Sequence, residues 1–384
     1  MPVFDFTVET PLPNTYRVAR THSLFNVTEG QAASHHISVA LPLEDKPWRI
    51  GAIIGPSGTG KTTLGKRILG SEAFHTGYAW DERPIVDVIG PDVSYDDVTG
   101  ALSAVGLGTV PSWLRPYGVL SMGERFRADL ARLLIEHSGD VVIDEFTSVV
   151  DRQIAQIGAN AFAKAWRRKP EADRAVVLSC HYDIIDWLQP DWILDTREWQ
   201  FDWRSVQRRP EIPLTIYETN WGAWPYFEPH HYLKLPRMVA ATNYVAEGPH
   251  GEPVCHVAVA TLAGMHTARL CRLVTMPEWQ GAGVGMKFLE CVAQLWLDGQ
   301  NRYGKRMTGI IHTSHPGLIA ALRRSARWVL VSQQMGGSNK GRSIETMSRW
   351  QVKAGKGAHS GGYGGHIRAV CGFRYVGDRK AATA

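Results

Sequence analysis

The amino-acid sequence predicts an α/β protein built from two domains, of which the second is of α+β type with a mixed central sheet. The chain has 384 residues, which is more than one hydrophobic core usually supports. A pattern of a buried strand, a glycine-rich turn and a helix occurs twice, at residues 48–69 and 273–290. Between these patterns, residues 201–235 are rich in prolines and aromatics and lack helical or strand periodicity. We therefore expect domains at residues 1–200 and 236–384, joined by a connector.

The composition is that of a folded protein, because 44% of the residues are hydrophobic and 21% are charged. No run approaches the roughly 18 apolar residues that a membrane-spanning helix needs. The first residues, MPVFDFTVET, lack the basic start and apolar stretch of a signal peptide, so we expect a cytoplasmic protein without a membrane partner. The five cysteines are scattered without a CxxC pair, which favours reduced, buried thiols over a disulfide framework or a zinc site.

The first glycine-rich turn lies in WRIGAIIGPSGTGKTTLGKRIL, residues 48–69. Its GxxxxGK[ST] pattern stands between a strand and a helix, which is the context in which such a loop binds nucleotide phosphates. Backbone N–H groups converge on the phosphates there, Lys61 reaches the outer phosphates, and the hydroxyl of Thr62 binds Mg²⁺. The sequence thus predicts a site for ATP and Mg²⁺. Contacts with the nucleotide are expected from Gly55, Ser57, Gly58, Gly60, Lys61, Thr62 and Thr63.

Two carboxylates end a second apolar strand, in DVVIDEFTSVVD at residues 140–151. Buried strands usually end in neutral turns, so the adjacent pair Asp144 and Glu145 calls for a chemical explanation. Asp144 suits a metal-bound carboxylate, and Glu145 suits a residue that orients or deprotonates the attacking water. The sequence therefore predicts ATP hydrolysis. Between the two motifs, LSMGERFRADLARLL places Ser121 before a helix whose first turn carries Gly123.

With these motifs in this order, residues 1–200 resemble the ABC-type ATPases. LSMGE stands where that family has LSGGQ, SVVD at 148–151 resembles the D-loop, and SCHYD places His181 as the switch histidine. The resemblance implies that Ser121 and Gly123 of one copy complete the ATP site of a second copy. It therefore implies a head-to-tail homodimer with ATP sandwiched between the two ATPase domains.

Three features depart from this family or stay open. No glutamine lies between Lys61 and Ser121, so the Q-loop glutamine is absent and coupling to a membrane partner is disfavoured. Met122 replaces a signature glycine. Neutral drift is the favoured interpretation of this replacement, and the functional alternative is that it slows ATP turnover. An aromatic that stacks on adenine is expected ahead of the glycine loop, with Phe25 or Tyr16 as candidates.

The second domain begins with three predicted strands, in MVAATNYVAE, EPVCHVAVATLAG and ARLCRLVTM. LVTMPEWQGAGVGMKFLE follows, and its Gln280, Gly283 and Gly285 fit the pattern Q/R-x-x-G-x-G/A of the GNAT acyltransferases. Strand, helix, strand and strand patterns come next, in RMTGIIHT, HPGLIAALRRS, ARWVLVSQQM and HIRAVCGFRYVG, and this order also resembles a GNAT sheet.

The GNAT resemblance implies that the turn holds the pyrophosphate of acetyl-CoA or another acyl-CoA on its backbone N–H groups, at a helix N-terminus. The residues concerned are Gln280, Gly281, Gly283, Val284 and Gly285.

Catalytic residues of the second domain are harder to place. Acyl transfer to an amine needs a base, and usually a donor for the departing thiolate. The tyrosine that GNAT enzymes often use is missing from HTSHPGLIAALRRSARW, and His312 and His315 are the nearest substitutes. Lone histidines are more often structural, so both assignments are hypotheses. Glu278, just before the turn, is a weaker candidate, because a solvent-exposed position explains it better.

The last part of the chain is strongly basic. Residues 302–384 contain fifteen Lys and Arg but only two acidic residues, Glu345 and Asp378. A basic, glycine-rich insertion near 336–366 carries Lys353 and Lys356 among aromatic side chains, which suits phosphate contacts and base stacking. A solvated hairpin with incidental charge explains the same composition equally well.

Nearly the whole chain resembles a small group of proteins in which an ABC-type ATPase is joined to a predicted GNAT acetyltransferase domain. The leading hypothesis is an ATPase whose cycle controls an acyl-CoA-dependent or related group transferase, acting on nucleic acid or on an amine associated with it. One alternative is an ATP-gated nucleic-acid-binding protein with a catalytically idle GNAT-like domain. Another is a nucleobase-modifying enzyme similar to the Mom-type DNA-modification proteins, which rests on fold-level analogy. The ATP-binding subunit of a transporter is disfavoured.

Overall fold

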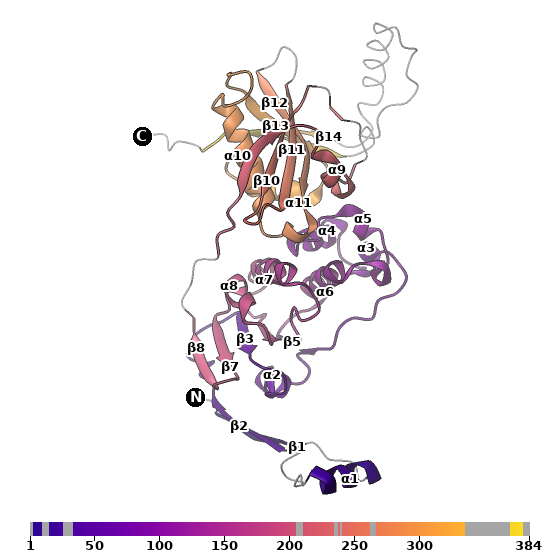
Figure 1. The fold of residues 1–384 in the computed structure, drawn as a ribbon, viewed down its shortest axis with the longest axis vertical. Helices are drawn as coiled ribbons and strands as arrows, with labels where there is room; N and C mark the ends of the chain where they lie inside the picture. Colours follow the sequence, from indigo (N-terminus) through magenta and orange to yellow (C-terminus); the bar gives the residue numbers. More distant parts are fainter. Residues whose placement is uncertain are drawn as a thin grey trace. The chain divides into compact units, whose positions relative to one another are not determined.

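The computed structural model of the chain describes residues 3–9, 15–25, 34–204, 210–233, 237–238, 240–261, 266–334 and 369–378 (Figure 1). The chain divides into two compact units. Unit 1 consists of Met1–Glu82 and Leu120–Pro210, and unit 2 consists of Arg83–Val119 and Glu211–Ala384. The predicted domain boundaries differ from this division chiefly in residues 83–119, which pack within unit 2. The predicted basic insertion near 336–366 lies outside the described residues.

A six-stranded sheet forms the centre of unit 1, in the order β4-β5-β6-β3-β7-β8. All neighbouring strands are parallel except β7 and β8. Strands β3 and β6 are buried along their whole length, as expected for the middle of a parallel sheet covered on both faces. The strands are β3 (Ile50–Ile54), β4 (Phe74–His75), β5 (Val141–Ile143), β6 (Ala175–Ser179), β7 (Trp192–Asp195) and β8 (Gln200–Trp203).

Four α-helices accompany this sheet in the described part of unit 1: α2 (Lys61–Leu69), α6 (Met122–Glu136), α7 (Arg152–Trp166) and α8 (Ile185–Leu188). The short 3₁₀ turn η2 (Tyr182–Ile184) precedes α8. Small residues of α7 and α2 allow close packing. A Cβ atom on Gly65 of α2 would lie 3.0 Å from a methyl group of Val142, so this helix lies tightly on the sheet.

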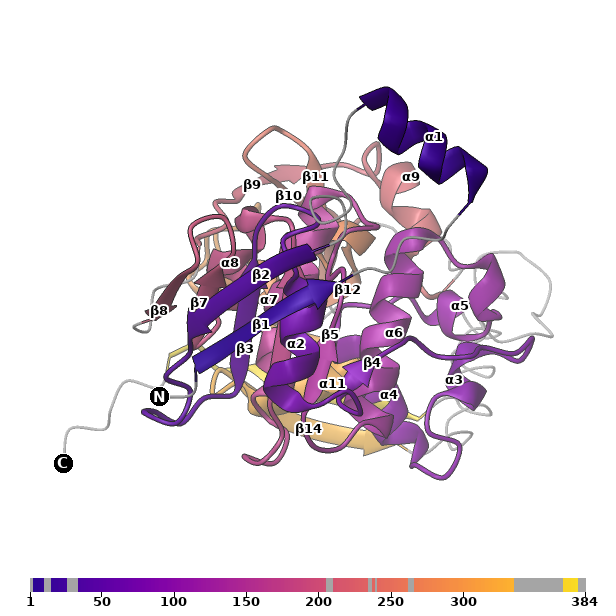
Figure 2. The same ribbon diagram turned by 90° about the horizontal axis from the view of Figure 1, so that it is seen from below.

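The N-terminal elements of unit 1 are β1 (Val3–Glu9), α1 (Tyr16–Phe25) and β2 (Ser34–Ala40). Strands β1 and β2 pair antiparallel and run side by side (Figure 2). Their apolar side chains Phe6, Ile37 and Val39 join a core cluster that includes Trp48 and Trp192. Tyr16 is 74% exposed. The prediction that Tyr16 or Phe25 stacks on adenine stays a prediction.

Unit 2 contains a seven-stranded sheet in the order β14-β15-β13-β12-β11-β10-β9. The pair β12–β13 is parallel and every other neighbouring pair is antiparallel, so the predicted mixed sheet is confirmed. The strands are β9 (Thr215–Thr219), β10 (Thr242–Glu247), β11 (Pro253–Thr261), β12 (Thr267–Thr275), β13 (Thr308–Thr313), β14 (Trp328–Gln334) and β15 (Val370–Tyr375). Strands β10 to β15 match the sequence predictions.

Helices cover both faces of this sheet (Figure 1). The longest is α10 (Val284–Leu297), from which Trp296 Nε1 donates to the hydroxyl of Tyr244 in β10 at 3.2 Å. The neighbouring residue Asn243 points to the other face, where α9 (Trp224–Phe227) and the 3₁₀ turn η3 (Glu228–His230) lie. The described part of the predicted connector therefore holds β8, β9 and α9. Of its aromatic residues, Trp224 and Phe227 are buried, whereas Tyr226 is 50% exposed.

His256 lies at the centre of this aromatic packing, fully buried. Its ring centroid lies 5.0 Å from that of Trp224 and 5.4 Å from that of Phe227. Burial lowers the pKa of His256 to about 4. The unfolded chain has a higher histidine pKa and binds more protons, so stability is lost as the pH falls from about 6.5 to about 4.

We expect His256 to contribute a loss of about 2 to 3 kcal/mol in unfolding free energy over this range, at about 1.4 kcal/mol per pH unit. Urea unfolding of the wild type and of His256→Gln at pH 7 and pH 4.5 measures it. The variant should lose less stability on acidification, and an identical loss in both proteins would contradict the assignment.

Residues 83–119 form the helical segment of unit 2 that comes first in the chain. It consists of α3 (Ile85–Val88), α4 (Tyr95–Ala104), α5 (Val110–Trp113) and the 3₁₀ turn η1 (Tyr117–Val119). Ser94 caps α4 by accepting from the N–H of Asp97 at 3.2 Å. Helix α4 lies beside α11 (Pro316–Arg324), which follows β13 (Figure 1).

Candidate functional site

The first glycine-rich loop follows β3 directly and leads into α2 at Lys61. Gly58 and Gly60 have φ angles of 82° and 88°, a backbone region that favours glycine. A Cβ atom on Gly55 would collide with the side chain of Thr196. Ser57 and Gly58 are exposed at the loop tip. The loop thus needs its glycines both for its turns and for its close approach to β7.

Lys61 lies inside this loop. Its Nζ atom donates to the carbonyls of Gly55 at 2.8 Å and Pro56 at 2.7 Å, and the residue is 9% exposed. The two loop carbonyls therefore hold the ammonium group of Lys61 within the curve of the glycine-rich loop. Thr63, two residues further on in α2, is half-buried.

The predicted metal ligands meet in the structure. Thr62 Oγ1 donates to Asp144 Oδ2 at 2.8 Å, although the residues are 82 positions apart. A hydroxyl and a carboxylate side by side supply the oxygen donors that Mg²⁺ prefers, and this cation takes its other ligands from water and phosphates. The donor set therefore fits Mg²⁺. The described ranges contain no group of three or more His, Cys, Asp or Glu that could hold a metal ion.

Glu145 follows Asp144 in a strained turn. Glu145 and Thr147 have φ angles of 50° and 70°, which side-chain-bearing residues adopt rarely and at a cost of about 1 to 3 kcal/mol. The exposed carboxylate of Glu145 accepts from Ser148 Oγ at 2.5 Å. The backbone N–H of Glu145 donates to Asp144 Oδ1 at 2.9 Å. The two neighbouring carboxylates therefore have different partners, since Asp144 accepts from Thr62 and Glu145 accepts from Ser148.

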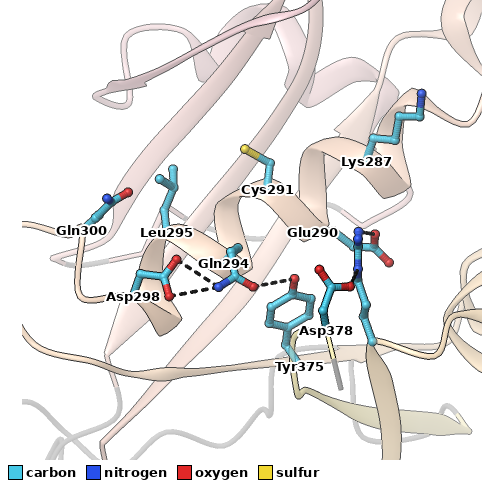
Figure 3. A pocket seen from close by; sticks show the side chains of 10 residues that line it. Lys287, Glu290, Cys291, Gln294, Leu295, Asp298, Gln300, Tyr375 and Asp378 are labelled. Atoms are coloured by element: carbon cyan, nitrogen blue, oxygen red, sulfur yellow. Dashed lines mark hydrogen bonds and ion pairs between the residues drawn. The ribbon is translucent and has the colours of Figure 1, made fainter. Parts of the chain in front are cut away.

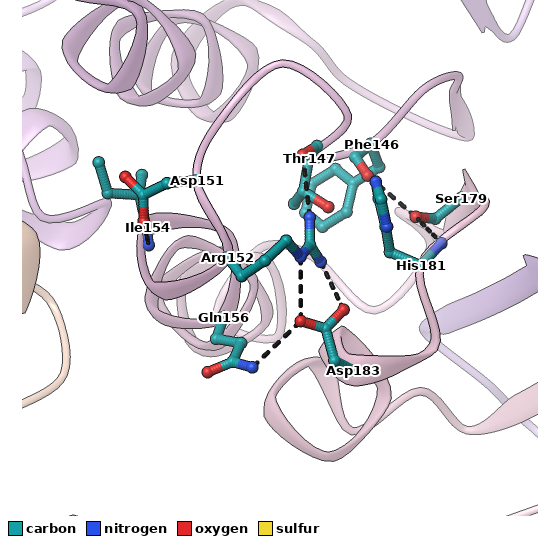
Figure 4. Close-up of polar contacts among 9 residues, drawn as sticks. All are labelled: Phe146, Thr147, Asp151, Arg152, Ile154, Gln156, Ser179, His181 and Asp183. Atoms are coloured by element: carbon teal, nitrogen blue, oxygen red, sulfur yellow. Dashed lines mark hydrogen bonds and ion pairs between the residues drawn. The ribbon is translucent and has the colours of Figure 1, made fainter. Parts of the chain in front are cut away.

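A polar network joins the loops that follow β5 and β6 (Figure 4). Arg152 donates from Nε to Asp183 Oδ2 at 3.0 Å, and Gln156 donates to the same oxygen at 3.1 Å. Burial acts to raise the pKa of Asp183, but the hydrogen bonds from Arg152 prevail and hold it below its ordinary value. The backbone N–H of the half-buried His181 donates to Ser179 Oγ at 3.1 Å. Ser179 Oγ in turn donates to the carbonyl of Phe146 at 3.1 Å, so the backbone of His181 is tied through the end of β6 to the loop after β5.

Ser121 begins α6 through a capping box with Glu124. The Glu124 carboxylate accepts from the backbone N–H and the hydroxyl of Ser121, both at 2.9 Å. A Cβ atom on Gly123 would lie 2.8 Å from Cδ1 of Ile154, so this glycine allows α6 to approach α7. Met122 is 51% exposed. The predicted role of Ser121 and Gly123 in a second copy's ATP site stays a prediction.

The second glycine-rich turn joins the 3₁₀ turn η4 (Pro277–Trp279) to α10. Gly281 and Gly283 have φ angles of 91° and 87°, and Gly283 precedes the helix without a side-chain cap. The space where a Cβ of Gly283 would lie is open, whereas a Cβ of Gly285 would collide with Thr275. Within the described part of the chain, no hydrogen bond occupies the N–H groups of Gly281, Gly283, Val284 and Gly285.

Gln280 has a different environment from the rest of the turn. Its Oε1 accepts from the N–H of Gly108 at 2.8 Å, and its Nε2 donates to the carbonyl of Thr275 at 3.0 Å. A Cβ atom on Gly106 would collide with the carbonyl of Gln280. The side chain of Gln280 therefore has partners within the protein, and its assignment to the acyl-CoA turn stays a prediction. Sequence reasoning missed residues 106–109, for which the only signal is the pair of glycines in GLG.

The two candidate histidines have different surroundings. His315 caps α11, since its Nδ1 accepts from the N–H of Leu318 at 3.3 Å, and its Nε2 lies 2.8 Å from the carbonyl of Gly108. Both ring nitrogens are thus occupied, and burial lowers the pKa of His315. These contacts favour a structural role for His315, and its assignment as a base stays a prediction.

His312 remains the accessible candidate. Its side chain is exposed on β13. Partial burial of the ring lowers the pKa of His312, and the positive charge of Arg269 lowers it further to a smaller degree. Gly372 in β15 lies between His312 and Ser332 of β14 in the register of the sheet. A Cβ on Gly372 would collide with Ser332 Oγ and lie 2.9 Å from His312 Nε2. Glycine at 372 therefore leaves room for the imidazole and the hydroxyl on one face.

A pocket of about 400 Å³ lies along α10, away from its N-terminus (Figure 3). Its polar side chains are largely paired with one another. Arg327 donates to Glu290 at 2.9 Å and to Asp378 at 2.6 Å, and the hydroxyl of Tyr375 donates to Gln294 at 3.0 Å. Cys291 in this pocket is exposed, so the expectation that all cysteines are buried is wrong for it.

Comparison with known proteins gives a partial match. No protein-family profile matches the chain. The chain is similar to zinc import ATP-binding protein ZnuC from two strains of Pseudomonas aeruginosa, UCBPP-PA14 and PAO1. Each is 31% identical over 144 residues, which cover 32% of this chain and 51% of the relative. The chain thus spans about half the length of the curated relatives that it matches.

No helix in the described residues is long and apolar enough to cross a membrane. The described mixed sheets belong to the α/β class. Together with the contact between Thr62 and Asp144, the similarity to ZnuC supports the presence of an ABC-type ATP-binding part in this chain.

Proposed function

We propose that unit 1 is an ABC-type ATPase that binds and hydrolyses ATP with Mg²⁺. The hydrogen bond between Thr62 and Asp144 carries this proposal, because it brings the helix after the glycine loop to the acidic end of β5. The similarity to an ATP-binding protein supports it independently. The positive φ angles of Glu145 and Thr147 support it as well, because backbone strain of this kind is concentrated at functional sites.

In this proposal, the phosphates of ATP lie on the backbone N–H groups of residues 57–62. Lys61 leaves the carbonyls of Gly55 and Pro56 for the phosphate oxygens, and Thr62 and Asp144 hold the metal. Bound Mg²⁺ would neutralise part of the phosphate charge. Glu145 accepts a proton from the attacking water or orients it, and His181 assists from the end of β6.

The working unit in this proposal is a homodimer, in which Ser121 and Gly123 of each copy complete the other copy's site. The N-terminus of the long helix α6 supports this, because helix N-termini attract phosphates. Binding of a phosphate there would compete with the Glu124 carboxylate for the hydroxyl of Ser121. The copies are expected to associate when ATP is bound.

For unit 2 we propose a GNAT-like group transferase that uses acetyl-CoA or another acyl-CoA. The sheet order supports this, with its single parallel pair in the middle. Pairing between β12 and β13 covers only Thr267–Leu270 and Thr308–Ile311, and the strands part beyond it. The unpaired N–H groups of Gly281, Gly283, Val284 and Gly285 follow the free end of β12 and suit a diphosphate.

His312 is the proposed base of the transfer step. The nitrogen of an acceptor amine attacks the thioester carbonyl carbon, the C–S bond breaks, and the amine proton passes to His312 while the thiolate departs. The lowered pKa of His312 keeps its imidazole neutral near pH 7, as a base must be. The nature of the acceptor, including an amine on a nucleic acid, is a further part of the proposal that rests on the basic composition of residues 302–384.

Calorimetry with acetyl-CoA tests this part. Replacing Gly283 by leucine fills the open space beside the turn, so we expect at least about a tenfold loss of affinity, equivalent to about 1.4 kcal/mol. Gly304→Leu is the matched control, because Gly304 also has a positive φ and open space at its Cβ position. It should bind acetyl-CoA as the wild type does.

Two results would contradict the transferase proposal. One is the absence of binding heat with the wild type, and the other is equal affinity in all three proteins. Salt-sensitive binding of a nucleic acid in the absence of acetyl-CoA binding would instead select the hypothesis of an ATP-gated binding protein.

A further inference from the structure

Residues 83–119 connect the two units covalently in an unusual way. In sequence they lie between β4 and α6, which both belong to unit 1, yet they form part of unit 2. The segment enters from Glu82 and returns at Leu120, one residue before the cap of α6 at Ser121. The segment is therefore covalently continuous with the start of α6.

Its tightest contact is made by Gly108. The N–H of this glycine donates to Gln280 Oε1, and its carbonyl accepts from His315 Nε2, each at 2.8 Å. Two residues earlier, Gly106 approaches the carbonyl of Gln280 so closely that a residue with a side chain would not fit at position 106. The turn that carries the unpaired N–H groups is therefore fixed, at its first residue, by residues 106–108.

Apolar packing supports these hydrogen bonds. Leu107 is 1% exposed and Trp113 is 2% exposed, and Trp113 Nε1 donates to the carbonyl of Leu107 at 2.6 Å. The ring centroids of Trp113 and His315 lie 5.8 Å apart. A Cβ atom on Gly317 of α11 would lie 2.6 Å from the side chain of Ser103 in α4. The segment is thus seated on α11 by close packing as well as by hydrogen bonds.

We propose that residues 102–113, the strap, transmit the nucleotide state of unit 1 to the second glycine turn. The surface formed by Gln280, His315 and Gly317, the dock, is the site on which the strap acts. ATP-driven association at Ser121 shifts the start of α6 and draws the strap from the dock. Gln280 is then released, and with it the turn at Gly281–Gly285 changes its capacity to hold a diphosphate.

This inference rests on the proposed ATPase and deepens the proposed coupling between the two activities. Thermodynamic linkage applies to this coupling. If ATP binding favours release of the strap from the dock, then weakening the contact between strap and dock raises the affinity for ATP by the same factor. The proposed coupling also gives a role to Gly106 and Gly108, both of which lie close to Gln280.

Hydrogen–deuterium exchange on the full chain tests the strap. The Glu145→Gln variant is compared with and without ATP and Mg²⁺, so that hydrolysis does not mix the two states. We expect peptides within 102–113 to exchange at least about tenfold faster with ATP, while peptides at 55–63 become protected. His315→Asn, added to this background, keeps a side-chain acceptor for α11 but shortens the reach to Gly108.

In the His315→Asn protein the strap should exchange rapidly even without ATP, and ATP should add little. Gly317→Ala should act in the same way by pushing on Ser103, and Ser103→Gly should restore slow exchange by removing the obstruction. Gly100→Ala is the control, because no atom lies within 4 Å of the added Cβ. It should leave exchange of the strap unchanged.

The outcomes distinguish a failure of the strap from a failure of the proposed ATPase. Protection at 55–63 with unchanged or slower exchange at 102–113 would overturn the strap while leaving ATP binding intact. Absence of protection at 55–63 would overturn the proposed ATPase, and the strap with it. Rapid exchange in Gly100→Ala equal to that in Gly317→Ala would also overturn the strap, because the effect would not depend on the dock.

Discussion

Replacing Glu145 with glutamine is expected to lower ATP turnover by about 100- to 10,000-fold, the range that a general base usually contributes. Glutamine has nearly the same shape and retains an oxygen that accepts from Ser148, so the strained turn should persist. It does not accept a proton from water as a carboxylate does. ATP binding, which relies on the loop N–H groups, Lys61 and the metal, should be retained.

Phosphate release at saturating ATP measures this effect, and light scattering measures the mass of the complex. Because the bound nucleotide is no longer consumed, Glu145→Gln should accumulate as an ATP-bound dimer. Glu136→Gln is the matched control, since Glu136 pairs with Arg132 at the other end of α6 and should not affect turnover. Unchanged phosphate release in Glu145→Gln would remove Glu145 from the mechanism.

Replacing Lys61 with alanine is expected to weaken ATP binding by about 100-fold, or about 3 kcal/mol, which is typical for the loss of one partner of a buried charge pair. Lys61 is 9% exposed, so its charge meets the phosphates with little screening by water. The variant also leaves the carbonyls of Gly55 and Pro56 without their donor, which should loosen the loop.

Calorimetric titration with a slowly hydrolysed ATP analogue measures the affinity, and thermal unfolding shows whether the fold is retained. Lys66→Ala provides the comparison, because Lys66 lies on the same helix with its ammonium group 4.3 Å from the ring centroid of Phe74. It should bind ATP normally. Equal affinities of Lys61→Ala and the wild type would show that the ammonium group has no role in nucleotide binding.

The sequence predicted most of the elements that carry the candidate sites. Val141–Ile143 is a short apolar run that ends in two carboxylates, and the structure places it as a buried strand between β4 and β6 of the parallel sheet. Alternation and turn residues likewise identified β10 to β15. Such patterns are local, so they can be recognised without knowing what each strand packs against.

The partners of individual side chains were not predictable in this way. His312 and His315 stand three residues apart and look equivalent in sequence, yet the structure exposes one and holds the other, half-buried, against Gly108. The difference depends on residues about 200 positions earlier in the chain. No local pattern carries this information, because a long-range contact leaves only weak signals such as the glycines at 106 and 108.

The sequence alone determined which chemical groups are available: a phosphate-binding loop, an acidic strand end and a second glycine turn before a helix. These depend on residue types at fixed spacing, which the covalent chain itself sets. Tertiary structure decided that Thr62 meets Asp144, that residues 83–119 pack with unit 2, and that Gln280 is held by Gly108. The physical reason is that burial and hydrogen-bond satisfaction act across the folded chain, and they select partners by distance in space rather than in sequence.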